Sequence, residues 1–99
     1  MDMNDITDWA RKTFGQVRPV RAAVRANEEM AELLKASCTD DEDKIMEEAA
    51  DVVIVLCHLA GSLNADLGRA IEKKMAKNRL RAWKLDGDGC GYHVPTQGA

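Results

Sequence analysis

The chain has 99 residues and a formal net charge of −3, which predicts one small domain with a modest core. No N-terminal segment has the pattern of a signal peptide, and the longest apolar stretch, residues 49–60, is too short to span a membrane. Three cysteines without metal-type spacing indicate free thiols in a reducing compartment. We therefore expect a cytoplasmic protein without a membrane partner.

Start and stop signals divide the sequence into four predicted helices, so the expected fold class is all-α. Gly15 ends the first helix, and Pro19 fits the first turn of the second. Thr39-Asp40-Asp41-Glu42 has the form of a capping box that begins the third. The expected helices run from about Asp5 to Phe14, from Pro19 to about Ala36, from the capping box to about Leu63, and from a cap at Asn64 or Asp66 to about Lys84.

The helical domain is thus expected over residues 1–85. The tail, residues 86–99, is rich in glycine and is expected to be extended. Its segment 88–93 can fold over a functional site as a lid, or it can be a disordered end, and the sequence supports both readings equally.

The third predicted helix contains the β-branched run Val52-Val53-Ile54-Val55, which can also be read as a buried strand. A helix is favoured because the apolar stretch is longer than a typical strand and continues a capped acidic segment. This helix is apolar on nearly every side, with Cys57 as a small core residue, and it requires burial all round. A homodimer that completes a four-helix-bundle-like core meets this requirement. A monomeric bundle with one poorly covered flank is the alternative.

Charge is segregated along the chain. Residues 28–51 hold ten acidic residues against two lysines, and residues 69–84 hold seven basic residues against one glutamate. Two acidic clusters, residues 28–32 and 47–51, each contain a pair of acids followed by a third acid three residues later. Residues three and four apart share a helix face, where like charges are destabilising unless they are neutralised. Mg²⁺ is the natural candidate because it prefers oxygen ligands.

The two clusters are expected to face each other. A short loop joins the second and third helices, so these helices should pack antiparallel with Glu32 and Glu48 at similar depth. Asp51 lies where the apolar run begins, a place where an unpaired carboxylate is costly, so a cation or a metal must compensate it. Lys44 can pair with Glu47 or Glu48. The alternative is an ordinary solvated acidic face.

The donor types narrow the choice of metal. A di-iron bundle requires Glu-x-x-His from two helices, which neither cluster supplies. Zinc is disfavoured because no group of His or Cys accompanies the acids. Glu-x-x-Glu with Glu-x-x-Asp suits Mg²⁺, with Mn²⁺ as a substitute.

The basic zone supplies groups that phosphates need. Four residues recur there at helical spacing: Lys74, Lys77, Asn78 and Arg81. Lysine binds phosphate as a point charge, and arginine binds it with a two-pronged fork. A solvated basic face is the alternative. A nucleic-acid surface is a further alternative, which the acidic zone and the negative net charge weaken, so no nucleic-acid partner is expected.

Together these features resemble the all-α nucleoside triphosphate pyrophosphohydrolases, the MazG-like group that also includes dimeric dUTPases and dCTPases. The family signature is Glu-x-x-Glu, a spacer and Glu-x-x-Asp, and Glu29-x-x-Glu32 and Glu48-x-x-Asp51 match it. Many members also carry a Lys-Met-x-x-Asn-Arg-x-Arg segment, which residues 74–81 match. The resemblance covers residues 20–84 and leaves out the first predicted helix and the tail.

The resemblance implies a MazG-type fold and a set of roles. The residues that would coordinate Mg²⁺ are Glu29, Glu32, Glu48 and Asp51. The residues that would hold the triphosphate are Lys74, Lys77, Asn78 and Arg81. Glu28 and Glu48 would take part in catalysis, with Glu28, or less readily Glu47, as an extra ligand or as the base for the attacking water. The reaction would convert a (deoxy)nucleoside triphosphate into the monophosphate and pyrophosphate, in a dimer or tetramer that removes surplus or unwanted nucleotides.

The sequence does not assign the residues that bind the base. Four aromatic residues can stack on a base or pack in a core: Trp9, Phe14, Trp83 and Tyr92. His58 lies two turns beyond Asp51 on the same helix face and can line the pocket or serve as a hydrogen-bonded core histidine. Val55 stands where dCTPase-like relatives carry tyrosine, so a cytosine preference is not implied. A narrow dUTPase- or dCTPase-like enzyme, and a non-catalytic helical dimer that binds nucleotide or a protein partner, are the alternative functions.

Overall fold

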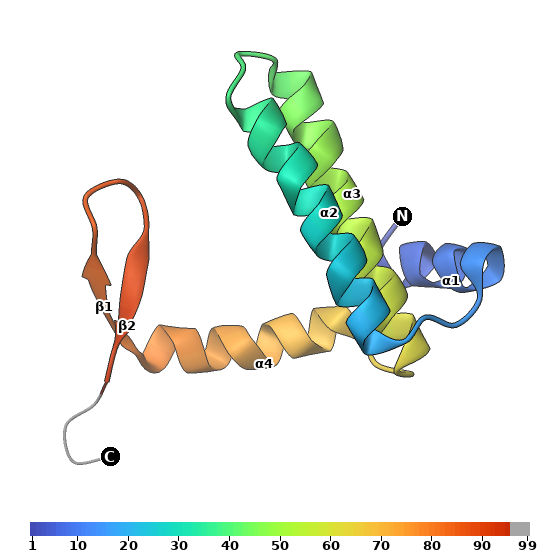
Figure 1. Ribbon diagram of the computed structural model, residues 1–99. Coiled ribbons are helices and arrows are strands. Elements are labelled where there is room, and N and C mark those ends of the chain that lie inside the picture. The colour runs from blue at the N-terminus through green and yellow to red at the C-terminus, as the bar shows by residue number, and fades with distance from the viewer. Residues whose placement is uncertain (96–99) are drawn as a thin grey trace. The chain divides into compact units, whose positions relative to one another are not determined.

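The computed structural model describes residues 1–95, which form four helices followed by a two-stranded antiparallel sheet (Figure 1). The elements are α1 (Met3–Phe14), α2 (Pro19–Ser37), α3 (Glu42–Ser62), α4 (Leu67–Leu80), β1 (Ala82–Leu85) and β2 (Gly91–Val94). The chain divides into two compact units, Met1–Gly68 and Arg69–Ala99. The predicted helical class is confirmed, and the small hairpin is an addition to it.

The first unit is a helical hairpin with a third helix packed on one side. α2 and α3 run antiparallel side by side, and α1 packs against α3 (Figure 1). Pro19 stands in the first turn of α2, where its missing N–H costs no hydrogen bond. Gly15 follows the last turn of α1 with a φ of +77°, a conformation that glycine adopts without strain. Both residues act where the sequence predicted.

The start of α3 differs from the prediction. Asp41 caps this helix, and its side chain accepts a hydrogen bond from the Lys44 backbone N–H at 3.0 Å. The Thr39 hydroxyl instead donates to the Ala36 carbonyl at 2.6 Å. The prediction of a capping box at Thr39 was wrong, because the Thr39 hydroxyl donates to a carbonyl of α2 and Asp41 is the N-cap of α3.

α3 is the central helix of the first unit. Its β-branched run, residues 52–55, is helical, as the length of the apolar stretch predicted. The buried apolar residues of the described chain are all small: Ala10, Ala22, Ala36, Cys57 and Ala60. Burial raises the pKa of the Cys57 thiol, while a hydrogen bond with Thr7 lowers it. The predicted core position of Cys57 is therefore confirmed.

The second unit contains most of α4 and the hairpin. α4 ends at Leu80, whereas the sequence predicted a helix to about Lys84. The Trp83 indole N–H donates to the Asn78 carbonyl at 3.0 Å, so a β1 side chain satisfies one of the carbonyls that a helix end leaves open. The sequence predicted that the helical domain ends at residue 85 and the tail begins at residue 86. The hairpin pairs β1, before this boundary, with β2, after it, and the boundary itself stays a prediction.

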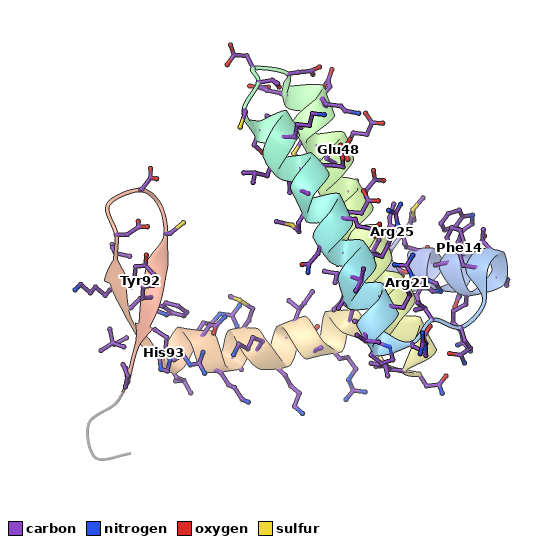
Figure 2. All side chains as sticks on the ribbon, viewed as in Figure 1. Phe14, Arg21, Arg25, Glu48, Tyr92 and His93 are labelled. Carbon is purple, nitrogen blue, oxygen red and sulfur yellow. The ribbon has the colours of Figure 1, made fainter. Side chains whose placement is uncertain are left out.

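The hairpin pairs Trp83 with His93, whose rings lie 6.4 Å apart; Figure 2 labels His93 and its neighbour Tyr92. Asp86 shapes the turn, because its carboxylate accepts two backbone N–H groups at 2.8 and 3.1 Å. The predicted extended tail is confirmed for β2, and Gly98 lies outside the described residues.

All three cysteines are free thiols, with Cys38 and Cys90 exposed, in agreement with the sequence. Within residues 1–95 no single helix is long and apolar enough to cross a membrane, and α3 with α4, a bent pair, meets these criteria only when both are taken together.

Gly61 generates a test of the packing between α3 and α1. A Cβ atom at this position would lie 2.6 Å from Cγ2 of Thr7 and 2.9 Å from Cδ of Arg11. We expect Gly61→Ala to lower the free energy of unfolding by roughly 1–2 kcal/mol, because overpacking exceeds the gain in helix propensity. Thermal unfolding followed by circular dichroism measures the change.

Thr7→Ser provides the matched background, since it removes the Cγ2 atom and keeps the hydroxyl that donates to the Met3 carbonyl at 2.9 Å. In that background Gly61→Ala should cost less. An equal cost in both backgrounds would show that contact with Thr7 does not restrict Gly61.

Candidate metal centre and adjoining pocket

Three carboxylates from two helices converge in the first unit. Glu29 of α2 and Glu48 and Asp51 of α3 each offer an oxygen atom, and these oxygens lie within 4.8 Å of one another. Glu48 and Asp51 share a face of α3 because they are three residues apart, and the antiparallel packing of α2 brings Glu29 to the same level. The two acidic clusters thus face each other as predicted, through these three residues.

Two of the three acids are nearly enclosed by protein. Glu29 is 8% exposed and Glu48 is 7% exposed, while Asp51 is half-buried. A carboxylate taken out of water is costly unless cations or hydrogen bonds compensate it. The site therefore requires positive charge from the protein or from a metal ion.

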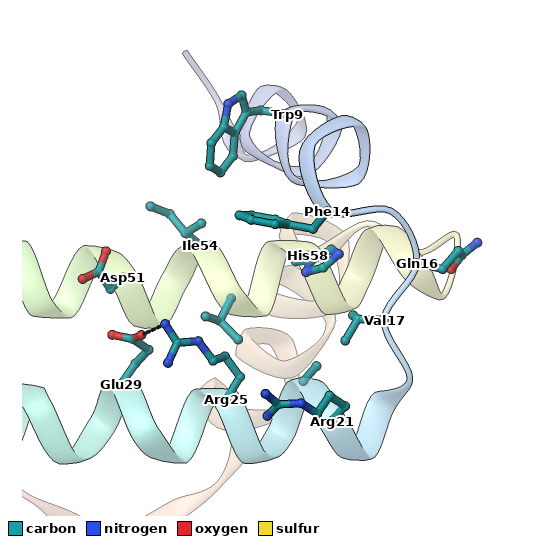
Figure 3. A pocket seen from close by; sticks show the side chains of 12 residues that line it. Trp9, Phe14, Gln16, Val17, Arg21, Arg25, Glu29, Asp51, Ile54 and His58 are labelled. Atoms are coloured by element: carbon teal, nitrogen blue, oxygen red, sulfur yellow. Dashed lines mark ion pairs between the residues drawn. The ribbon is translucent and has the colours of Figure 1, made fainter.

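Arg25 supplies such a charge to Glu29. Its Nη2 atom lies 2.6 Å from Oε1 of Glu29 (Figure 3), and its Nη1 atom donates to Oε2 of Glu28 at 2.8 Å. The hydrogen bond with Glu28 and the charges of Glu29 and Asp51 raise the pKa of the Arg25 guanidinium. One arginine thus bridges both acids at the start of the first cluster.

Lys44 supplies a positive charge to the second acidic cluster in the same way. Its ammonium nitrogen lies 2.9 Å from Oε1 of Glu48 and 3.9 Å from Oε2 of Glu47. The hydrogen bond with Glu48 and the charge of Glu47 raise the pKa of Lys44. Lys44 pairs with both acids, whereas the sequence predicted a pair with one of them.

The remaining acids predicted for the site lie outside the group of three. Glu32 is exposed, although its charge contributes to the raised pKa of Lys44. The Glu28 side chain is 51% exposed and lies 3.9 Å from Arg21 in addition to its bond with Arg25. The spacing in the sequence placed the three acids of each cluster on one helix face, but only the carboxylates of Glu29, Glu48 and Asp51 lie close together.

The residues predicted to bind phosphate belong to the second unit: Lys74, Lys77, Asn78 and Arg81. Arg81 donates from Nη1 to Oδ1 of Asn78 at 3.5 Å, and both side chains are half-buried. Lys74 and Lys77 are exposed. Asn78 and Arg81 therefore lie side by side, as the helical spacing predicted.

A pocket of about 470 Å³ adjoins the acid cluster. Glu29 and Asp51 line one end of it, and the rings of Phe14 and His58 line the other (Figure 3). The Phe14 ring lies 5.6 Å from the His58 ring and 5.5 Å from the Trp9 ring. The pocket thus has an acidic end and an aromatic end.

His58 is hydrogen-bonded and lines the pocket, but it is half-buried and does not belong to the core. Its Nε2 atom lies 2.7 Å from the Gly15 carbonyl oxygen, and because that oxygen only accepts, this nitrogen carries the proton. The same ring lines the pocket. A hydrogen bond to the loop after α1 therefore fixes a ring in the pocket wall.

Sequence reasoning missed Arg21, Arg25 and Val17 as pocket residues. The two arginines project from the first turns of α2 (Figure 2). Arg25 precedes Glu29 by four residues, a spacing that identifies a helical ion pair and could have revealed it. Val17 is positioned by a distant contact, since its backbone N–H donates to Oγ of Ser62 at 3.0 Å, and no local pattern indicates such a contact.

The donor set fits a hard divalent cation. Mg²⁺ and Mn²⁺ prefer carboxylate oxygens, and the candidate metal-binding group within residues 1–95 consists of carboxylates alone. These ions also retain water and bind substrate oxygens, so three protein ligands leave room for both. The predicted Mg²⁺ or Mn²⁺ cofactor therefore agrees with the chemistry of the site.

Sequence comparison finds relatives for most of the chain. A sequence model of the MazG-like family matches residues 26–89. A dATP/dGTP diphosphohydrolase of cyanophage S-2L is 32% identical over 91 residues, which cover 92% of this chain and 83% of the relative. A dATP/dGTP diphosphohydrolase of Salmonella phage PMBT28 is 36% identical over 89 residues, or 90% of this chain, and the chain spans only 29% of that relative's length.

Two solved structures share the fold. The cyanophage S-2L MazG-like pyrophosphohydrolase, bound to dGDP and three catalytic Mn²⁺ ions per active site, has a TM-score of 0.71 and 31% identity over 95% of this chain and 90% of that chain. The Bacillus-conserved MazG protein, a nucleotide pyrophosphohydrolase, has a TM-score of 0.70 and 31% identity over 83% of this chain and 94% of that chain. The predicted fold and enzyme class are thus confirmed at the level of the family. By sequence, fold and acidic site, the chain belongs to the MazG-like family.

Proposed function

We propose that the chain hydrolyses the purine deoxynucleoside triphosphates dATP and dGTP to their monophosphates and pyrophosphate, with divalent metal ions at the acid cluster. The observation that carries this proposal is the continuity of the cluster with the pocket, because Glu29 and Asp51 belong to both. A nucleotide with its base in the pocket can then present its phosphates to the metal ligands. The names of the two phage relatives support purine substrates.

The proposed metal ligands are Glu29, Glu48 and Asp51, with Glu32 as a fourth from the same helix as Glu29. When bound, Mg²⁺ or Mn²⁺ would neutralise phosphate charge and lower the pKa of a coordinated water. The joint presence of dGDP and Mn²⁺ in the active site of the cyanophage structure supports this arrangement.

The aromatic end of the pocket is the proposed base site. Trp9 and Phe14 offer ring faces for stacking, and a volume of about 470 Å³ lies in the range of small-molecule sites. Arg21 lines the same pocket, and its N–H groups suit the acceptor atoms on a purine edge. Trp9 is 53% exposed, so stacking on a base would also remove apolar surface from water.

The second unit is proposed to bind the triphosphate through Lys74, Lys77, Asn78 and Arg81. The lysines would act as point charges, and the arginine would bind two phosphate oxygens at once. The match of residues 74–81 to a segment common in the family supports this role.

The proposed reaction is attack of a water oxygen on the α-phosphorus with cleavage of the α–β anhydride bond. Glu28 or Glu48 accepts the proton that the water loses, and pyrophosphate leaves with the bridging oxygen. Arg25 forms ion pairs with both Glu28 and Glu29, and this supports a position for the Glu28 carboxylate close to the metal ligands. The proposed role is removal of surplus or unwanted nucleotides in the cytoplasm.

We further propose that the chain forms a homodimer and that two such dimers can associate into a tetramer. α2 carries exposed apolar side chains at helical spacing, between 46% and 69% exposed: Val20, Val24, Met30 and Leu34. Apolar surface gathered in this way is unfavourable in water and marks contact sites. A second copy that covers it would complete the helical core that the sequence predicted.

The proposed activity is tested by pyrophosphate release from dATP, dGTP, dCTP, dTTP and dUTP with Mg²⁺ or Mn²⁺. We expect dATP and dGTP to be hydrolysed fastest, EDTA to abolish release, and Glu48→Gln to lower kcat/KM by about 100-fold or more. Glu42→Gln, an exposed position in the first turn of α3, is the matched control and should retain the rate. Preference for a pyrimidine, or no release with any nucleotide, would contradict the proposal.

The ligand assignment is tested by calorimetric titration with Mn²⁺ in the absence of nucleotide. We expect Asp51→Asn to weaken binding by about tenfold or more, because it removes a charged ligand from the group of three. Glu32→Gln should have a smaller effect, since the Glu32 carboxylate lies outside that group. An equal loss in both variants would put Glu32 among the principal ligands.

The dimer is tested by sedimentation velocity of the wild-type chain and of Val24→Glu combined with Leu34→Glu. We expect the wild type to sediment as a dimer or tetramer and the variant as a monomer, because two charges would have to be buried in the interface. Lys35→Glu, an exposed position on the same helix, is the control and should leave the assembly intact. A monomeric wild type would contradict the proposal.

A further inference from the structure

Two basic side chains form ion pairs with carboxylates that a metal ion would need. Arg25 contacts Oε1 of Glu29 at 2.6 Å, and Lys44 contacts Oε1 of Glu48 at 2.9 Å. Both acids are more than nine-tenths buried. The two contacts therefore involve the two proposed ligands that are most enclosed by protein.

A divalent ion and these side chains compete for the acids. The group of three carboxylates carries up to three negative charges, and Arg25 and Lys44 bring two positive charges into contact with it. A doubly charged ion placed among them would be repelled by both cations at short range. Metal binding is therefore favoured when the two side chains withdraw.

Each cation already has a second carboxylate to which it can withdraw. Arg25 also donates to Glu28 at 2.8 Å, and Lys44 also lies 3.9 Å from Glu47. These alternative partners are at least half exposed, with side-chain exposures of 51% for Glu28 and 69% for Glu47. In each acidic cluster the first acid of the pair thus faces solvent, while the next acid in the sequence faces the group of three carboxylates.

We propose that Arg25 and Lys44 are exchangeable counter-ions of the metal centre. A divalent ion replaces Arg25 on Glu29 and Lys44 on Glu48, and each cation is retained by the acid that precedes its partner, Glu28 or Glu47. The second acid of each doubled pair, Glu29 or Glu48, then serves as a metal ligand. The first, Glu28 or Glu47, anchors the displaced cation, so the exchange leaves the role of base for the water to Glu48.

The exchange rests on the proposed metal centre and extends it to the nucleotide. Arg25 lines the pocket together with Glu29 and Asp51, and Figure 3 shows its side chain directed at Glu29 from the pocket side. A guanidinium released from Glu29 but kept by Glu28 stays beside the pocket, where its two-pronged donors suit a phosphate group. Arg25 is thereby a positioning residue that links metal binding to nucleotide binding.

The test is Mn²⁺ affinity without nucleotide, measured by electron paramagnetic resonance of the free ion. We expect Arg25→Gln and Lys44→Gln each to bind Mn²⁺ roughly three- to tenfold more tightly than the wild type, because a competing cation is gone. Lys35→Gln removes the same charge from an exposed position on α2 and should stay within about twofold of the wild type. Arg25→Lys keeps a cation and should also stay near the wild type.

Unchanged or weaker Mn²⁺ binding in both Arg25→Gln and Lys44→Gln, in folded protein whose wild type binds the ion, would overturn the exchange and leave the metal centre standing. A wild type that binds no Mn²⁺ would instead overturn the metal centre itself. A second readout is independent of the variants' stability. In ¹⁵N spectra of the wild type, Mg²⁺ should shift the side-chain Nε signal of Arg25 more than that of Arg21, and equal shifts would contradict the exchange.

Discussion

The antiparallel packing of α2 on α3 is the constraint on which the site depends. It brings a carboxylate of one helix within 4.8 Å of two carboxylates of the other, an arrangement that repulsion opposes strongly outside bulk water. Contacts of 2.6 Å from Arg25 and 2.9 Å from Lys44 compensate this charge. The interface between the helices and the chemistry of the site therefore use the same side chains, and a substitution among them acts on both.

The packing of α1 against α3 adds the second half of the site. α1 contributes Trp9 and Phe14 to the aromatic end of the pocket, and this helix precedes the family match over residues 26–89, whereas His58 at the same end comes from α3 inside that match. Arg21 and Arg25 precede that match as well. The acids thus lie inside the segment that the family model matches, while the pocket wall that would meet a base is built largely from residues before that segment. This division is physically reasonable, because metal chemistry is common to all substrates and base recognition is not.

The sequence allowed prediction of those features that depend on local spacing. Helical period placed Glu48 and Asp51 on one face. The short loop between the two helices predicted Glu32 at the depth of Glu48, whereas the acid that meets Glu48 and Asp51 is Glu29, about one turn earlier on α2. The start of α3 was less predictable, because Thr39 and Asp41 both offer an oxygen that can cap a helix. Asp41 caps α3, while the Thr39 hydroxyl donates to the Ala36 carbonyl in α2. The hairpin was missed because each strand has four residues, too few for an alternating pattern to be distinguished from a fraying helix.

Other parts of the site depend on contacts between distant segments. No sequence pattern joins Val17 to Ser62 or the Gly15 carbonyl to His58, although these two hydrogen bonds fix the loop that closes the pocket. The pairing of Arg25 with Glu29 was within reach of the sequence, since the residues are four apart on one helix. Ion pairs at this spacing are common on exposed helix faces, so the spacing alone does not mark a functional site.

The proposed activity depends on Glu29, Glu48 and Asp51 together holding divalent metal at the acidic end of the pocket. The most direct measurement is a crystal structure of the chain grown with Mn²⁺ and dGDP, with the ions located by their anomalous scattering. We expect anomalous peaks bonded to all three carboxylates, and the dGDP phosphates bound to the same ions. Peaks elsewhere on the protein, with Arg25 and Lys44 still in contact with Glu29 and Glu48, would contradict it.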